Sequence, residues 1–238
     1  MTERLYMMDS YLRSCDSKVK LVNGEKVVLD RTVFHPLSGG VANDLGTIAH
    51  SGTEYNVVDV SEDRSTGDIV HALSTTPSFK EGDLVTVELD WERRYALMKL
   101  HTAAHVLSSI MYKKYGALIT GGHVDPDMAK DDFSIEKSDR TIFEKAIEEV
   151  NEAASKAVEV KIYTMARDEA LKIPGIVKLA DKAPPEVREL RIVEIPGIDV
   201  QADGGPHVRN TSEIGKVALV RVENKGRNRK RVYYKIAE

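Results

Sequence analysis

Cysteine, net charge and long apolar runs are scarce in this 238-residue sequence, and each shortage excludes a class of protein. The single cysteine, Cys15, rules out an internal disulfide and suits a reducing cytosol. A net charge of −4 gives no global positive field, so any nucleic-acid contact must be a local patch. No apolar run approaches the length of a membrane span, and the first residues begin no signal-peptide pattern. We therefore expect a cytoplasmic protein without membrane contact.

The rest of the composition is that of an ordinary globular protein, with 42% hydrophobic and 30% charged residues. A chain of this length can form one large domain or two modest ones, each with its own core. Neither an internal repeat nor a low-complexity segment interrupts it.

The first part of the chain predicts strands and tight turns. Asn23-Gly24 is a strong signal for a type I′ hairpin, and Ser51-Gly52-Thr53 indicates a second hairpin. Short strands are expected over residues 19–21, 26–29, 47–49, 55–60, 68–73 and 84–89. Such a series favours a small barrel or sandwich, which we assign to a domain over residues 1–90.

The second part, residues 91–238, mixes helices and strands. A helix is expected after the N-cap Asp90 and up to Gly116, and Thr141-x-x-Glu144 predicts a capping box for a second helix. Residues 120–124 are expected to form a turn. Strands are expected over residues 131–135, 158–163, 188–195, 216–222 and 231–236. This irregular alternation predicts an α+β domain in which helices pack on a mostly antiparallel sheet.

Two histidines and one distant fragment carry the chemistry. His101 and His105 are four residues apart, so they share one helical face and both imidazoles can reach one atom. Alone, such a pair is as compatible with a core role as with a ligand role. The fragment Gln201-Ala202-Asp203-Gly204-Gly205-Pro206-His207 adds a third histidine and a carboxylate, completing a set that zinc accepts. No glutamate follows His101, so a His-Glu-x-x-His protease is disfavoured.

Taken together, the two fragments resemble the editing domain of alanyl-tRNA synthetase. The second one reads DGGPHVRNTSEIG over residues 203–215, and residues 32–46, with Gly39 and Gly40, look like the glycine-rich segment of the same family. A chain of this length that has both parts resembles a free-standing AlaX protein of the medium, two-domain kind.

The resemblance implies an activity and a site. AlaX proteins act in trans and hydrolyse the ester of alanine tRNA mischarged with serine, and in some members glycine. The implied ligands of one Zn²⁺ per chain are His101, His105 and His207, with Asp203 as the fourth. A zinc-activated water would attack the ester carbonyl, the metal would polarise that carbonyl, or the substrate's α-amino group would bind the metal; the sequence leaves these open.

Three places in the sequence depart from the family pattern. Asp203 stands where most relatives have cysteine, so it either binds zinc through oxygen or orients a histidine from outside the ligand set. Pro206 replaces a threonine. Ser38-Gly39-Gly40-Val41 replaces Gly-Gly-Gly-Gln, so no role that needs a glutamine amide is expected there.

Substrate recognition is assigned to two further groups. A site that hydrogen-bonds a hydroxyl rejects the analogue lacking it, and the resemblance points to Thr32 as the residue that reads serine; the alternative is a solvent-facing threonine at a strand start. Phosphate contacts would come from a basic cluster, for which the alternative is a solvated hairpin. Its members are Arg209, Lys225, Arg227, Arg229 and Lys230.

Two other classes of function stay open at this point. The chain could be a zinc hydrolase of a different small ester or amide, or a tRNA-binding module without a metal. Mischarged alanine tRNA is the expected partner, and no obligate protein partner is inferred.

Overall fold

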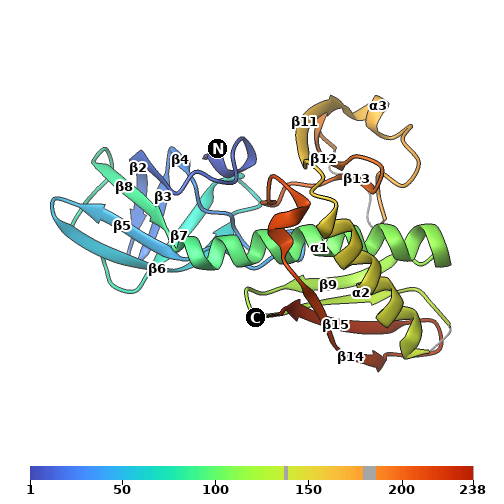
Figure 1. The fold of residues 1–238 in the computed structure, drawn as a ribbon. Helices are drawn as coiled ribbons and strands as arrows, with labels where there is room; N and C mark the ends of the chain where they lie inside the picture. Colours follow the sequence, from blue (N-terminus) through green and yellow to red (C-terminus); the bar gives the residue numbers. More distant parts are fainter. Residues whose placement is uncertain (137–138, 179–185, 238) are drawn as a thin grey trace. The chain divides into compact units, whose positions relative to one another are not determined.

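The computed structural model describes residues 1–136, 139–178 and 186–237 (Figure 1). The chain divides into two compact units, Met1–Ala96 and Leu97–Glu238. This division falls inside the long helix α1 (Trp91–Tyr115), whereas we expected a boundary at residue 90, before the helix. None of the helices in the described ranges is long and apolar enough to cross a membrane.

The first unit is a closed β-barrel, as the turn pattern predicted. Its strands are joined in the order β2-β3-β7-β6-β5-β8, and β8 pairs with β2 to close it (Figure 1). Alternate residues of β8 point inward, since Val85, Val87 and Leu89 are buried and their neighbours are exposed. The elements are β1 (Glu3–Arg4), η1 (Leu5–Met7), β2 (Ser14–Asn23), β3 (Lys26–Leu29), β4 (Arg31–Thr32), β5 (Gly46–His50), β6 (Thr53–Glu62), β7 (Ile69–Leu73) and β8 (Leu84–Leu89).

Both expected hairpins are confirmed, but one turn type is wrong. Asn23 pairs with Lys26, so the turn residues are Gly24-Glu25, and only Gly24 has a positive φ (60°). A type I′ turn needs positive φ at both central residues. The turn at Ser51-Gly52 meets that condition, with φ values of 49° and 83°.

A buried ion pair anchors the glycine-rich segment to the barrel. The guanidinium of Arg94 pairs with the Asp44 carboxylate, and both side chains are inaccessible to solvent. Arg94 also donates to the carbonyls of Ser10 (2.9 Å) and Val33 (2.6 Å), while Asp44 accepts from the backbone N–H of His35 (2.5 Å). Because each charge is paired and hydrogen-bonded, this pair can stay buried and hold both ends of the segment in place.

The second unit confirms the α+β prediction. One antiparallel sheet has the order β14-β15-β10-β9 and another has the order β11-β12-β13. Residues 101–109 of α1 are buried on every face, so the helix is a core element and its histidines lie inside. Helix α2 packs on β14, where Asn151 bonds both backbone groups of Val217 at 2.7 and 2.9 Å. Besides α1, the elements are β9 (Ile119–Val124), β10 (Ala129–Phe133), α2 (Arg140–Ser155), β11 (Lys161–Ala166), α3 (Arg167–Ala170), β12 (Glu189–Ile195), β13 (Asp199–Ala202), η2 (Thr211–Ile214), β14 (Val217–Asn224) and β15 (Lys230–Ile236).

Two local predictions in this unit are wrong. Residues 120–124 belong to strand β9 rather than a turn, because Gly122 leaves room for the neighbouring strand: a Cβ there would lie 2.6 Å from Asp131 Oδ1. Helix α2 is capped by Asp139, whose carboxylate accepts from the N–H of Thr141 at 2.9 Å. Thr141 therefore lies inside the helix and forms no capping box.

Candidate metal centre

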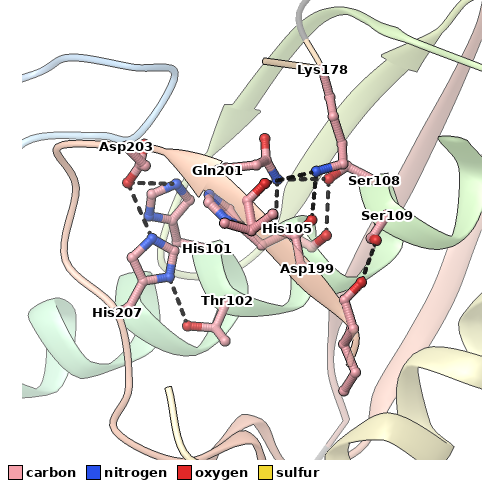
Figure 2. A network of polar contacts seen from close by, with 12 residues as sticks. His101, Thr102, His105, Ser108, Ser109, Lys178, Asp199, Gln201, Asp203 and His207 are labelled. Atoms are coloured by element: carbon pink, nitrogen blue, oxygen red, sulfur yellow. Dashed lines mark hydrogen bonds and ion pairs between the residues drawn. The ribbon is translucent and has the colours of Figure 1, made fainter. Parts of the chain in front are cut away.

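The two separated fragments meet inside the second unit (Figure 2). His101 and His105 project from α1, and Asp203 and His207 project from the loop that follows β13. Their four potential ligand atoms lie within 4.8 Å of one another. The three histidines are buried and Asp203 is half-buried. This cluster could hold a metal ion.

Close packing of the rings requires a glycine in the loop. The His101 and His105 rings meet edge to face, with centroids 4.9 Å apart, and the His207 ring stacks on His101 at 4.1 Å. At Gly205, a Cβ would lie only 2.7 Å from His101 Cε1, which no real Cβ contact allows. Gly205 is therefore present so that the loop backbone can approach His101, and not because of a left-handed backbone conformation.

A buried arginine holds this loop from behind. Arg191, on β12, donates from Nη1 to the carbonyl oxygens of Asp203 and Gly205, both at 2.9 Å, and its own carbonyl accepts from the Asp203 N–H at 3.1 Å. After His207 the chain enters η2, where Asn210 and Glu213 form a capping box. Both ends of the loop are thus fixed by hydrogen bonds.

In two of the three imidazoles, Nδ1 faces a group that can only accept a hydrogen bond. His101 Nδ1 lies 3.2 Å from the carbonyl oxygen of Pro206, and His105 Nδ1 lies 3.2 Å from Asp199 Oδ2. A carbonyl oxygen and a carboxylate cannot donate, so both neighbours favour a proton on Nδ1. In a neutral imidazole of this tautomer, Nε2 keeps its lone pair.

The third imidazole reaches the same state through a hydroxyl. Thr102 donates its O–H to the Met98 carbonyl at 2.9 Å, so its oxygen accepts from His207 Nδ1 at 3.0 Å. All three histidines therefore have Nδ1 beside an oxygen that can accept, as in a metal-ligating histidine with a bonded second nitrogen, and His207 Nε2 lies 3.1 Å from Asp203 Oδ1, a contact that a metal held between them would replace. Three neutral imidazoles and one carboxylate suit a divalent ion such as zinc.

The charges in the cluster fit ligand chemistry. Burial alone would raise the pKa of Asp203, but His101 and a hydrogen bond to His207 outweigh it and hold this pKa well below its usual value. Burial, together with His101 and His105, holds the pKa of His207 well below its usual value. An ionised carboxylate and a neutral imidazole are the forms that bind a metal.

Comparison with known proteins identifies the family. An alanyl-tRNA editing protein AlaX-M of Saccharolobus solfataricus is 48% identical to this chain over 237 residues and 99% of each chain. The AlaX-M of Methanosarcina barkeri is 38% identical over 245 residues and the whole of both chains. This chain belongs to the AlaX-M family of alanyl-tRNA editing proteins.

More distant matches place AlaX-M beside the synthetases. An alanine–tRNA ligase of Ignicoccus hospitalis is 34% identical over 226 residues, which is 92% of this chain but 24% of the ligase. Residues 190–233 match the family model described as the threonyl and alanyl tRNA synthetase second additional domain, and residues 7–93 match the model for class II (A) tRNA synthetases. The family resemblance expected from the two motifs is confirmed.

Behind His105, this AlaX-M member has a polar network that we did not predict (Figure 2). Asp199 Oδ1 accepts from Lys178 Nζ at 2.6 Å, and Asp199 Oδ2 accepts from Gln201 Nε2 at 2.8 Å. Gln201 Nε2 also lies 3.1 Å from Ser108 Oγ. Burial would raise the pKa of Asp199, but His105 and Lys178 lower it to about 2.

The glycine-rich segment, residues 32–46, lies in the first unit. Gly39 and Gly40 form a two-residue turn with φ values of 60° and 86°, closed by hydrogen bonds between Ser38 and Val41. Thr32 is fully buried, which contradicts a solvent-facing threonine. Its hydroxyl lies 2.9 Å from His71 Nε2 and accepts from the N–H of Phe34 at 3.1 Å.

The predicted basic residues differ in what they contact. Arg209 and Arg227 are exposed. Lys225 pairs with Glu223 at 2.8 Å, and Arg229 pairs with Asp132 at 3.3 Å. Lys230 is buried, and its ammonium donates to the carbonyls of Gly226 (3.0 Å) and Arg227 (3.1 Å), so it stabilises the β14–β15 loop.

Proposed function

We propose that this AlaX-M member removes serine from mischarged alanine tRNA by hydrolysing the ester to the 3′-terminal adenosine, with the glycyl ester as a second substrate. The coarse part of this function, alanyl-tRNA editing by deacylation, follows from family membership at 48% identity over almost the whole chain. The identity of the metal, the site residues and the amino acid removed are our own inferences.

The proposed reaction centre is the cluster in the second unit. His101, His105 and His207 would hold one Zn²⁺ through Nε2, with Asp203 as the fourth ligand. The observation that carries this assignment is that each of the three Nδ1 atoms lies 3.0–3.2 Å from a separate oxygen that can accept, while the four candidate ligand atoms lie within 4.8 Å of one another. Zinc bound there would supply a Lewis acid and a bound water of lowered pKa.

The residues of the chain supply position rather than acid–base chemistry. Arg191 and the capped turn after His207 hold two of the proposed ligands, and α1 holds the other two in its buried middle. A water-excluding, fixed site of this kind strengthens electrostatic stabilisation of charge that develops on an ester oxygen.

Thr32 is retained as the residue that reads the serine hydroxyl. His71 accepts a hydrogen bond at Nε2, because its Nδ1 lies 3.2 Å from the Val27 carbonyl and donates to it. The Thr32 O–H therefore points at His71, and its oxygen can only accept from other groups. Besides the bond that it accepts from the Phe34 N–H, this oxygen has one lone pair for a further donor, which the serine side chain offers and the alanine side chain does not.

Contact with tRNA is proposed for the exposed basic residues Arg209, Lys225, Arg227 and Arg229. Phosphate contacts release counterions, so the affinity for tRNA should fall steeply with salt. Lys230 is left out of this proposal because its ammonium is buried against loop carbonyls.

The test is a deacylation assay with seryl-, glycyl- and alanyl-charged alanine tRNA, with and without a chelator, alongside elemental analysis of the purified protein. We expect one zinc per chain, hydrolysis of the seryl ester with the alanyl ester spared, and recovery of activity when zinc is returned after chelation. Hydrolysis of small esters that does not depend on tRNA would indicate a different zinc hydrolase. Binding of tRNA without metal and without hydrolysis would indicate a binding module.

A further inference from the structure

A second buried carboxylate lies beside the proposed ligands and contacts one of them. The side chain of Asp199, on β13, is fully buried, and its Oδ2 lies 3.2 Å from His105 Nδ1. Two other side chains face it: Lys178 reaches Oδ1 at 2.6 Å and Gln201 reaches Oδ2 at 2.8 Å (Figure 2). Lys178 and Gln201 donate to this carboxylate, and His105 Nδ1 faces it at ion-pair distance.

We propose that Asp199 is a positioning residue that fixes the tautomer and orientation of His105, and that Lys178 fixes the orientation of Asp199. This inference rests on the proposed metal site. Because a carboxylate only accepts hydrogen bonds, it holds the proton of His105 on Nδ1 and leaves the Nε2 lone pair for the metal. Asp199 acts only through His105 and is not itself a ligand.

Lys178 determines which side-chain atoms position 199 can present. Its ammonium is buried and also donates to the carbonyls of Gly175 (3.0 Å) and Val200 (3.3 Å). An ammonium has three protons to donate and no lone pair to accept with, so an oxygen of residue 199 must face it. Gln201 also donates to residue 199, but its amide can turn over and present oxygen, whereas the ammonium cannot accept. A replacement of Asp199 that has one oxygen and one donor is therefore expected to keep its oxygen toward Lys178.

Asparagine at position 199 is such a replacement. Its amide oxygen has to face Lys178, so its NH₂ group faces His105. His105 would then have to accept at Nδ1 and carry its proton on Nε2, which removes the lone pair that the metal needs. In the double variant Asp199→Asn/Lys178→Met the ammonium is gone, so the amide can turn its oxygen back toward His105.

The experiment compares the full chain with Asp199→Asn, the double variant and the control Asp125→Asn. Asp125 suits this purpose because it is an exposed aspartate of the same unit, and its Oδ2 lies 3.1 Å from His123 Nε2. Histidine ¹⁵N NMR of the metal-free proteins reports the tautomers, and competition against a chromophoric chelator reports zinc affinity. We expect Asp199→Asn to move the His105 proton to Nε2 and to weaken zinc binding by about 10–100-fold. The double variant should recover the His105 tautomer and most of the zinc affinity. Asp125→Asn should keep the wild-type His105 tautomer and zinc affinity.

Unchanged tautomer and zinc affinity in a folded Asp199→Asn protein would overturn the proposal even if the wild type binds zinc. A wild type that binds no zinc would instead overturn the proposed metal site. The NMR comparison would then still test whether Asp199 fixes the His105 tautomer. If Asp199→Asn does not fold, Asp199→Ala/Lys178→Met removes the acceptor and the buried cation together. Wild-type zinc affinity in that protein would also refute the role of Asp199.

Discussion

Replacing Gly205 by alanine is expected to displace one proposed ligand while leaving the surrounding unit folded. The new Cβ would lie 2.7 Å from His101 Cε1, 3.0 Å from His101 Nδ1 and 3.3 Å from Asp203 Oδ1. Non-bonded carbon atoms prefer about 3.5–4.0 Å, so the ring and the loop must separate by about 1 Å. The backbone of residue 205 itself is not strained by alanine, because its φ is not positive.

Neither side of this contact can yield freely. The His101 ring is stacked on His207 and bonded to the Pro206 carbonyl at 3.2 Å, and Arg191 holds the loop by two hydrogen bonds of 2.9 Å. Overpacking of this kind costs about 1–3 kcal/mol of folding free energy. A misplacement of about 1 Å at a reacting centre can lower the rate about 10²-fold. We therefore expect weaker zinc binding and about a hundredfold slower hydrolysis of seryl-tRNA.

The measurements are zinc affinity by chelator competition, the deacylation rate and the melting temperature of the metal-free protein. Gly121→Ala is the matched control, since its Cβ would lie at an ordinary 3.4 Å from Asp132 Oδ2 in the same unit. A well-folded Gly205→Ala protein with wild-type zinc affinity and activity would refute the argument that this loop and His101 meet at the metal.

Three other changes test the remaining assignments. Thr32→Val should slow hydrolysis of the seryl ester more than that of the alanyl ester, and an equal change in both rates would remove Thr32 as the discriminator. Burial lowers the pKa of His71 to about 4, so the unfolded state binds the proton more tightly and stability falls by up to roughly 3 kcal/mol as the pH drops from 6.5 to 4. Unfolding followed by the fluorescence of Trp91, the single tryptophan, should show this loss of stability at low pH. In His71→Gln, the part of the loss that His71 causes should be absent. Arg227→Ala should weaken tRNA binding and reduce the salt slope by about 1, whereas Lys161→Ala on β11 should not.

Where turn residues and periodicity are local signals, the sequence predicted the structure well. The barrel followed from its hairpins, and the buried central helix followed from apolar spacing around its histidines. Strand β9 was misread because glycines usually mark turns, whereas the reason for Gly122 is the Asp131 side chain on the next strand. A sequence pattern cannot reveal that reason, because it depends on strand pairing.

The candidate site likewise contains residues with a local sequence signal and residues that only tertiary packing brings together. The proposed ligands were found because helical spacing and a distinctive loop mark them. Of the side chains that orient them, Thr102 lies within the histidine motif, and Asp199 and Gln201 lie on the short strand β13, which we did not predict and which ends one residue before Asp203. Lys178 and Arg191 carry no local signal at all, since only tertiary packing brings their charges to the site.

The two roles that the sequence left open for Asp203 can now be weighed by which nitrogen its carboxylate approaches. A carboxylate that orients a histidine from outside the ligand set contacts Nδ1 when Nε2 binds the metal, as Asp199 does with His105. Asp203 does the opposite, because its Oδ1 lies 3.1 Å from His207 Nε2 and 3.8 Å from His101 Nε2. The same oxygen accepts from the N–H of Gly205 at 2.8 Å, which keeps it turned toward the two rings. The geometry therefore favours Asp203 as a direct ligand that would bind the metal through oxygen.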